Sequence, residues 1–381
     1  MLRRFHMNKL YQSLYQLLVK IVLFESRIQY VRGWSPRNPS LHFKLVWVKI
    51  AAREQRHQRG QLLAILGWII YIPLQILFVP ISIVGGLVAA YKQVWASKKF
   101  GVSSTATKVL EGRLHMHWFG LREDQATDKL SKALPNFSRT AHRVLLFPMY
   151  LLYKLSKTRL YPEIVAQGDE GLINMVPSRT VHFDELISSR KDSAVQFVAL
   201  GAGFDTRSYG LLKDSNLKLF ELDQASTQQL KIQSLRKASV DSSAVNFVEA
   251  DFAKEDWFQR LKNNGYDPSL KTIFLWEGVT LYLSEADVRK TLQTVKSNSA
   301  PGSVLIADIY GFDFLKMLNK GSKVLEATNE SLGGFGLDFT TDPELALSHF
   351  AESEQTALGQ HFFLGTNSKS GTFMVVTEIV L

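Results

Sequence analysis

The chain has 381 residues, of which 46% are hydrophobic and 21% are charged, so it can bury a sizeable core and wholesale disorder is excluded. A chain of this length allows two domains, or one domain with a long extension. It contains no cysteine, which excludes disulfide bonds, zinc–thiolate sites and cysteine nucleophiles.

The net charge of +10 is concentrated at the N-terminus. Residues 1–59 hold twelve Lys or Arg residues against two Glu, which leaves 33 basic and 33 acidic residues in the rest of the chain. Because this basic segment runs directly into a long apolar one, an anionic membrane surface is favoured over nucleic acid as its partner. Apolar residues at helical spacing between Leu10 and Val22 predict a basic amphipathic helix, either at the membrane interface or packed on the main domain.

Residues 60–91 contain no charged side chain. As a helix they would span about 48 Å against a hydrocarbon core of about 30 Å, which is more than one crossing and less than two. Pro73 and Pro80 lie near the middle, and each removes a helix donor. Basic residues flank both ends, which favours both ends on the cytoplasmic side. The preferred interpretation is a proline-broken hairpin that enters the bilayer and returns; the alternatives are one tilted, kinked span or a buried hairpin in a soluble protein.

From about residue 194 the chain consists of short apolar runs separated by helical or loop segments. The first five runs are nearly continuously hydrophobic, which is typical of a parallel sheet covered on both faces. The last two are joined by the turn-forming stretch Gly365–Gly371, which predicts an antiparallel hairpin. The expected fold is α/β, with a doubly wound, mostly parallel, seven-stranded Rossmann-like sheet. The predicted strands are 195–200, 218–222, 246–250, 272–276, 303–308, 361–364 and 372–380.

The first predicted strand ends in a glycine-containing turn. Gly201 and Gly203 would let the backbone approach a ligand closely and lead into a helix whose amides face it, although an ordinary strand-to-helix turn is an alternative. A dinucleotide-binding fingerprint would need a third glycine at position 206, which is Thr. Pyrophosphate binding, and with it a nicotinamide oxidoreductase, is therefore disfavoured.

The next three predicted strands end in acidic residues. Asp223 follows Gly201 by 22 residues, the spacing of a carboxylate that holds ribose hydroxyls. Asp251 and Phe252 suit an adenine amino group and ring, and Glu277 ends the fourth strand. Each acid alone could be a solvated strand end or a helix cap. Together the four strand ends predict a nucleoside-bearing cofactor without a pyrophosphate, for which S-adenosyl-L-methionine is the candidate.

The stretch from about Val176 to Tyr310 resembles the class I S-adenosylmethionine-dependent methyltransferases related to leucine carboxyl methyltransferase, and most of all the O-methyltransferases of polyketide-type biosynthesis. The resemblance covers about a third of the chain. It implies a methyltransferase domain, placed at 101–381 with a helical lid at about 101–190 and a sheet core at about 194–381. The basic and apolar pattern of residues 1–100, which the resemblance does not cover, predicts a helical membrane-anchoring region before it. The matching motifs are Arg179-Thr180 with Phe183-Asp184, LGAGFDTRSY (200–209), FELD (220–223) with Lys231, FLWEGVTLYL (274–283) and APGSVLIADIY (300–310).

The resemblance also implies residue roles. Arg179 would pair with the carboxylate of the cofactor's methionine part, which the backbone of Gly201 and Gly203 would also face, and Glu277 would meet the ammonium group. Asp223 would hold the ribose, and Asp251 and Phe252 the adenine. Two further motif residues, Asp205 and Arg207, are expected to fix the glycine loop, and Lys231 is expected to be a solvated helix lysine.

Catalytic and metal residues are less well marked. His182 is a weak candidate for a catalytic base, because a lone histidine is more often structural. His115 and His117 alternate without a further ligand cluster, so no metal site is predicted. Phosphate-binding and nucleophile-elbow motifs are not found, which disfavours kinases and hydrolases.

The predicted function is O-methylation of a small or lipid-like acceptor by a membrane-associated enzyme whose catalytic half faces the cytoplasm. A carboxylate acceptor would need no general base, whereas a hydroxyl would. The alternative is a membrane-tethered scaffold that binds the cofactor without transferring its methyl group.

Overall fold

The computed structural model describes residues 41–252, 256–320, 332–369 and 371–381, with side chains from residue 62 onward. The chain divides into two compact units, Met1–Leu63 and Ala64–Leu381. The predicted amphipathic helix between Leu10 and Val22 lies outside the described residues. Everything that follows on packing and the site concerns the second unit.

The core of the second unit is a seven-stranded sheet in the order β3-β2-β1-β4-β5-β7-β6. β1 to β5 pair in parallel, and β7 runs antiparallel to both β5 and β6. The predicted sheet, with five parallel strands and a final reversed hairpin, is therefore confirmed. The strands are β1 (Gln196–Leu200), β2 (Lys218–Asp223), β3 (Val245–Glu249), β4 (Thr272–Trp276), β5 (Val304–Tyr310), β6 (Ala357–Leu364) and β7 (Met374–Val380).

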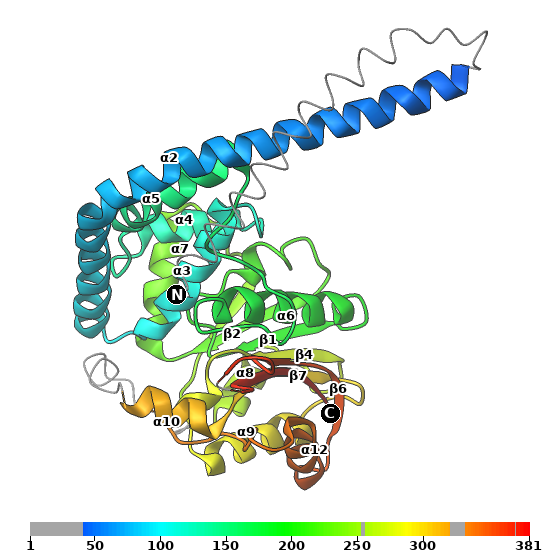
Figure 1. The fold of residues 1–381 in the computed structure, drawn as a ribbon. Helices are drawn as coiled ribbons and strands as arrows, with labels where there is room; N and C mark the ends of the chain where they lie inside the picture. The colour runs from blue at the N-terminus through cyan, green and yellow to red at the C-terminus, as the bar shows by residue number, and fades with distance from the viewer. Residues whose placement is uncertain (1–40, 253–255, 321–331, 370) are drawn as a thin grey trace, which may run out of the picture. The chain divides into compact units, whose positions relative to one another are not determined.

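Both faces of the sheet are buried, which explains why its central strands are mostly hydrophobic. Alternate residues of β1 show the division: Phe197 and Ala199 join one core cluster, and Val198 and Leu200 join the other. The first cluster includes buried residues of α3 (Ser104–Trp118), α4 (Gln125–Ala133), α6 (Met175–Arg190) and α7 (Ala225–Lys237). The second includes residues of α8 (Trp257–Asn263), α9 (Glu285–Ser297) and α12 (Pro343–Ser353). Figure 1 shows the helices around the sheet.

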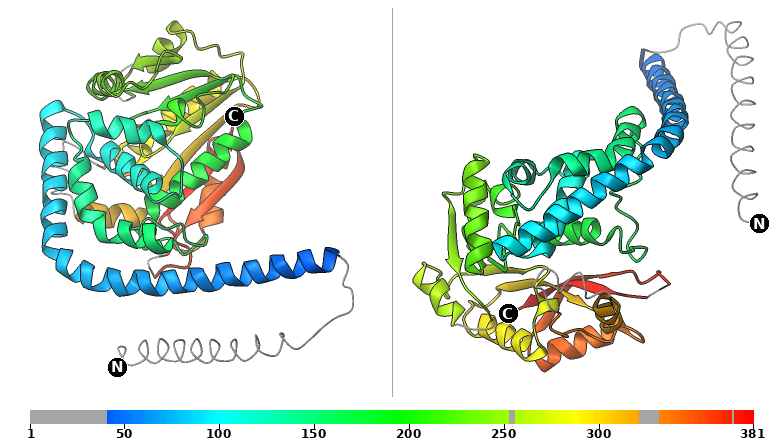
Figure 2. Two further views of the ribbon diagram at one scale, coloured as in Figure 1. Left: turned by 90° about the horizontal axis from the view of Figure 1, so that it is seen from above. Right: turned by 90° about the vertical axis from the view of Figure 1, so that its left-hand side faces the viewer.

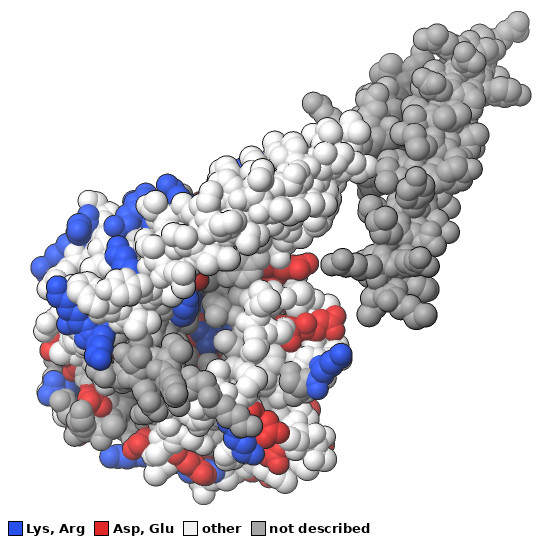
Figure 3. Space-filling model, turned by 60° about the vertical axis from the view of Figure 1, so that its left-hand side comes forward, with Lys and Arg blue, Asp and Glu red and all other residues white. Residues whose placement is uncertain are grey.

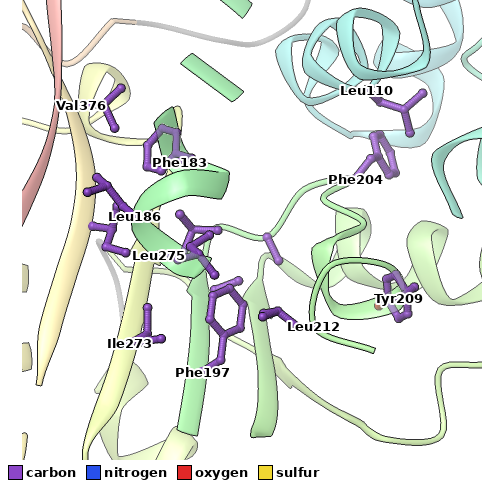
Figure 4. Packing of buried hydrophobic residues seen from close by; sticks show 14 of the residues in the cluster. Leu110, Phe183, Leu186, Phe197, Phe204, Tyr209, Leu212, Ile273, Leu275 and Val376 are labelled. Atoms are coloured by element: carbon purple, nitrogen blue, oxygen red, sulfur yellow. The ribbon is translucent and has the colours of Figure 1, made fainter. Parts of the chain in front are cut away.

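The first cluster joins the helical segment before the sheet to the sheet itself. In Figure 4, Phe183 and Leu186 of α6 point toward Ile273 and Leu275 of β4 and Phe197 of β1. Leu110 of α3 packs near Phe204, which lies in the turn after β1. The segment predicted as a lid is therefore anchored in the same hydrophobic core as the sheet, and α3 lies next to the glycine turn.

The apolar segment does not form the predicted hairpin. One helix, α2 (Leu41–Phe100), runs through both Pro73 and Pro80, and it bends toward its C-terminal end without reversing (Figure 2). Proline removes one hydrogen bond from a helix but does not by itself reverse the chain. The helix packs along α5 (Arg139–Ser156), where Phe78 and Phe147 have ring centroids 5.0 Å apart and a Cβ on Gly85 would lie 3.1 Å from the Ala141 carbonyl oxygen.

Most of the apolar segment is nevertheless exposed. Ile76 and Leu77 are 69% and 73% exposed, and Leu62–Phe100 is long and apolar enough to cross a membrane. The stretch of this helix from Leu62 to Tyr91 is white where Figure 3 shows it, because it contains no charged side chain. The alternative of a hairpin buried inside a soluble protein is therefore wrong.

The last turns of α2 belong to the fold of the second unit. Ala96 and Ser97 are buried, and the Asn136 side-chain amide donates a hydrogen bond to Ser97 Oγ at 3.2 Å. The Gln93 amide donates to the Ser104 carbonyl at 2.8 Å. The unit that contains the sheet begins at Ala64, so it starts earlier than the boundary predicted near residue 100.

Candidate functional site

A cavity of about 520 Å³ lies at the carboxyl ends of β1, β2 and β4. The strand order reverses between β1 and β4, and doubly wound sheets bind ligands at such a switch point. The turn after α2 and one face of α3 complete its wall. Six of the seven residues predicted to bind the cofactor line it: Gly201, Gly203, Asp223, Asp251, Phe252 and Glu277.

The turn after β1 depends on its two glycines. Gly201 has φ +71° and Gly203 has φ +43°, a left-handed conformation that side chains with a Cβ disfavour. A Cβ on Gly201 would also lie 2.5 Å from Cγ2 of Val279, across the cavity wall. The backbone at this turn therefore stays bare toward the cavity, which is the property that close approach of a ligand requires.

Asp223 connects the end of β2 to the glycine turn. Its Oδ2 accepts a hydrogen bond from the Gly203 amide at 2.6 Å, and its Oδ1 accepts one from the Gln224 amide at 2.7 Å. Burial nevertheless raises the pKa of this carboxyl to about 6, because desolvation outweighs the two amide bonds. A carboxylate that lines a cavity and holds the turn beside it can accept further hydrogen bonds from ligand hydroxyls.

Asp251 and Phe252 lie just beyond β3, at the far side of the cavity. The Phe252 ring meets the Trp257 ring edge-on, with centroids 5.2 Å apart. An aromatic ring held by a second ring beside a carboxylate suits a flat heterocycle with an exocyclic amino group.

Glu277 is the centre of a buried cluster of arginines. Its carboxylate lies 2.7 Å from Arg113, 2.5 Å from Arg207 and 3.2 Å from Arg179. Burial opposes its ionisation, but the three guanidinium groups outweigh that effect and lower the pKa of Glu277 to about 2. Glu277 is therefore a permanent anion at the cavity wall.

Arg179 is the one predicted binding residue that does not line the cavity. It lies behind Gly278, where a Cβ would be 3.6 Å from the Arg179 Nη1. Its guanidinium donates to Asp308 at 2.9 Å and to the Tyr310 hydroxyl at 2.7 Å, and its Nε has no hydrogen-bond partner in the described part of the chain. Because Gly278 has no side chain, only its backbone lies between the Arg179 guanidinium and the cavity.

Asp205 and Arg207 hold the glycine turn in place. The Arg207 amide donates to Asp205 Oδ1 at 2.7 Å, and the fully buried Arg207 side chain also reaches Asp184 at 2.6 Å. Asp184 pairs in turn with Arg122 at 2.6 Å. Asp205 itself also lines the cavity, so its carboxylate serves both the turn and the cavity wall.

Two expectations need correction. Lys231 is not a solvated helix lysine: it is buried, and its ammonium pairs with Glu221 at 2.7 Å. His182 does not line the cavity; its ring stacks on Phe362 with centroids 4.1 Å apart, and burial lowers its pKa. A catalytic role for His182 at this cavity therefore has no geometric support.

Arg113 is the main site residue that sequence reasoning missed. It is 1% exposed, lines the cavity and pairs with Asp205 at 3.0 Å as well as with Glu277. No described residue makes a hydrogen bond with its Nε. Arg113 lies on α3, 164 residues from Glu277, in a helix whose sequence contains none of the recognised motifs. A buried arginine in a basic chain has no local signature.

Comparisons with known proteins agree with this geometry. The leucine carboxyl methyltransferase family model matches residues 131–296, which include all seven predicted binding residues but not Arg113. A putative S-adenosyl-L-methionine-dependent methyltransferase of Mycobacteroides abscessus is 34% identical over 131 residues, 34% of this chain and 43% of that protein. One from Mycobacterium bovis is 31% identical over 182 residues, 46% of this chain and 51% of that protein. The chain spans about half the length of the curated relatives that it matches.

Solved structures with a similar arrangement include the mitomycin 7-O-methyltransferase MmcR, with a TM-score of 0.38 and 12% identity over 55% of this chain and 56% of that one. Another is magnesium protoporphyrin IX methyltransferase from Synechocystis with bound S-adenosylhomocysteine, with a TM-score of 0.35 and 12% identity over 56% of this chain and 90% of that one. The sequence matches support S-adenosyl-L-methionine as the cofactor. Residues 131–296 are thus similar to the leucine carboxyl methyltransferase family, and the matched relatives support an S-adenosyl-L-methionine-dependent methyltransferase.

Proposed function

We propose that this protein is a membrane-associated O-methyltransferase that uses S-adenosyl-L-methionine and methylates a carboxylate on a hydrophobic acceptor. The observation that carries the proposal is the convergence of Gly201, Asp223, Asp251 and Glu277 on one cavity, within the segment that matches the methyltransferase family. Residues from four strand ends, far apart in sequence, meet there.

The cavity residues fit this cofactor. Asp223 is placed to accept hydrogen bonds from ribose hydroxyls, and Asp251 with Phe252 to hold adenine. The turn at Gly201 and Gly203, which have no side chains, leaves room for the amino-acid end of the cofactor. Glu277 would contact the ammonium group of that end. Arg179 lies behind Gly278 and pairs with Asp308 and Glu277, so it supports the acids of the cavity wall rather than lining the cavity. When bound, the cofactor supplies an electrophilic methyl group on a sulfonium, and the protein's part is to orient the acceptor oxygen toward it.

The acids of the cavity that are not assigned to the ribose or the adenine favour a carboxylate acceptor over a hydroxyl; Asp223, whose pKa is about 6, is taken up by the ribose in this proposal. A hydroxyl needs a general base with a pKa near the working pH. Glu277 has a pKa of about 2, and Arg113 and Arg207 also keep the pKa of buried Asp205 below its usual range. Among the described residues, no histidine lines the cavity. An acceptor carboxylate is already a nucleophile, and Arg113 offers a cation at the cavity wall to hold it.

The connection between α2 and the cavity supports a hydrophobic acceptor. Gly101 and Val102 line the cavity and directly follow Phe100, the last residue of α2. The exposed apolar side chains of α2 suit insertion in a bilayer, so an acceptor in the membrane would lie near the entrance to the site. S-adenosyl-L-methionine is a cytosolic cofactor, so we place the catalytic unit on the cytoplasmic side.

Calorimetric titration with S-adenosyl-L-methionine, followed by incubation with membrane extract and a cofactor labelled in its methyl group, tests the function. We expect binding and a labelled lipid-extractable product that releases methanol on mild alkaline hydrolysis, as methyl esters do. A labelled product stable to alkali would replace the carboxylate with a hydroxyl acceptor. Binding without any transfer would leave the scaffold alternative, and absence of binding would refute the assignment.

Flotation with liposomes that contain anionic lipid tests the membrane role. Leu77→Lys places a charge on α2 at a side chain that is 73% exposed, and Ile173→Lys is a matched control because Ile173 is equally exposed outside α2. We expect Leu77→Lys to weaken flotation while Ile173→Lys and cofactor binding stay unchanged. Equal flotation of both variants would remove α2 as the membrane contact.

A further inference from the structure

A second group of side chains with ligand chemistry lies on the side of α3 that faces α5. Glu111 and His115 are four residues apart on α3, so they share one face of the helix. His142, from the first turns of α5, meets them. One ligand atom from each of the three lies within 4.8 Å of the other two. In the sequence, the histidine nearest to His115 is His117, and no further ligand cluster lies close by. In the fold, His115 instead lies beside Glu111 and His142.

Each of the two histidines is buried and has one ring nitrogen without a hydrogen-bond partner among the described residues. His115 and His142 are 1% and 3% exposed, and the unpartnered atoms are His115 Nε2 and His142 Nδ1. Buried polar atoms are normally paired, so two such nitrogens beside one carboxylate call for a ligand between them.

The remaining contacts of the three residues fit metal coordination. Glu111 Oε1 faces His142 Nδ1 at 3.7 Å, while its Oε2 accepts from the half-exposed Lys108 at 2.9 Å. His115 Nδ1 lies 3.2 Å from the Tyr161 hydroxyl, the kind of outer partner that fixes the tautomer of a metal-binding histidine. The exposure of Lys108 lets its ammonium turn toward water, away from an incoming cation.

From this geometry we propose that Glu111, His115 and His142 bind a divalent transition-metal ion, with zinc as the best fit, through Glu111 Oε1, His115 Nε2 and His142 Nδ1. Two imidazoles and one carboxylate are a common zinc ligand set, and a water would complete a tetrahedron. Bonds of about 2.0–2.2 Å require the side chains to close in slightly from their present separations. The ion would join α3 to α5.

The position of this site on α3 gives it a link to the cofactor cavity. At 3.6 residues per turn, Glu111 and His115 project from the side of α3 opposite to Val109 and Arg113, which line the cavity. A metal on the outer face would therefore hold the helix that carries Arg113. The site is distinct from the cavity, and its occupation does not depend on the cofactor.

Calorimetric titration of ZnCl₂ into the full-length, tag-free chain in detergent, after removal of metal with a chelator, tests the proposal. We expect one zinc per chain. Glu111→Gln and His142→Gln should each weaken zinc binding by at least about tenfold, which is the smallest loss usual even for outer-shell partners. His117→Gln is the matched control on the same helix, since His117 Nδ1 accepts from the Asp124 amide and faces no ligand of this group.

A second readout separates loss of the site from loss of the fold. In excess chelator, Glu111→Gln should show the far-UV circular dichroism of the unsubstituted chain. Adding zinc should then raise the thermal midpoint of the unsubstituted chain and of His117→Gln but not that of Glu111→Gln. Absence of stoichiometric binding, or equal binding by Glu111→Gln, His142→Gln and the control, would overturn the proposal.

Discussion

Replacing Glu277 with glutamine removes the anion that three buried arginines share. Its carboxylate lies 2.7 Å from Arg113 and 2.5 Å from Arg207, and its side chain is 6% exposed. Glutamine keeps the shape and a hydrogen-bonding oxygen but leaves the guanidinium charges without this partner. We therefore expect the variant to fold less stably even when no cofactor is present.

The size of the effect follows from the shift in the Glu277 pKa. Burial opposes ionisation, but the arginines lower the pKa from an ordinary 4.5 to about 2. At about 1.4 kcal/mol per pKa unit, this corresponds to about 3 kcal/mol of folding free energy, within the range of about 3–5 kcal/mol for breaking a buried ion pair. Because the folded-state pKa is depressed, this stability is present above pH 4.5 and is lost as the pH falls from there toward 2.

Urea unfolding in detergent, followed by tryptophan fluorescence, measures this difference. At pH 7, Glu277→Gln should lower the free energy of unfolding by about 3 kcal/mol, and at pH 4 the difference should be smaller. Glu344→Gln is the control, because Glu344 pairs with His361 at 2.8 Å on the surface and exposed pairs contribute less than about 1 kcal/mol. A Glu277→Gln variant within about 0.5 kcal/mol of the unsubstituted chain would refute the account of the arginine cluster.

Three further outcomes follow from the site. Burial raises the Asp223 pKa to about 6, so the affinity for S-adenosyl-L-methionine, measured by calorimetry, should fall about tenfold between pH 7 and pH 5. Asp223→Asn should bind the cofactor weakly at both pH values. If the variant showed the same pH dependence as the unsubstituted chain, this carboxylate would not be the group that titrates. Gly201→Ala should lower the free energy of unfolding in urea by at least about 1 kcal/mol more than the control Gly371→Ala. The two glycines have nearly the same φ, +71° and +70°, but of the two only Gly201 has an atom within 2.5 Å of where a Cβ would lie. Equal losses in the two variants would argue against that clash. Lys231→Met should lower the free energy of unfolding by about 3–5 kcal/mol, because it leaves the buried Glu221 carboxylate without its cation. Adding Glu221→Gln to this variant should recover part of the loss. A further, additive loss in the double variant would show that the ion pair does not matter.

The sequence alone was sufficient for the sheet and for the residues at its strand ends. Parallel strands covered on both faces are mostly hydrophobic, so β1 and β4 stand out as short apolar runs, and β2 does so apart from Glu221 and its two ends. Parallel strands also end at one edge of their sheet, so the strand pattern by itself places Gly201, Asp223 and Glu277 close together. The hydrophobic runs identify the strands, and the residue types at their carboxyl ends identify the ligand site.

The hairpin in the apolar segment could not be judged from the same kind of signal. Two prolines and an intermediate length suggested a reversal, but a helix can continue through a proline when neighbouring contacts support it, as α5 does for α2. The decision lay in packing against a helix that lies more than fifty residues beyond the prolines, for which the apolar run contains no signal.

Only the tertiary structure brings together the charges whose partners lie far away in the sequence. Arg113 reaches Glu277 across 164 residues, and His115 meets His142 from another helix. Whether a charged or ionisable side chain is solvated, paired or ligand-binding depends on which groups the fold places within a few ångströms, because electrostatic and coordination energies fall steeply with distance and with solvent access. Composition and spacing identify the residues capable of such chemistry, and the packing of α3 against the sheet and against α5 determines which of them meet.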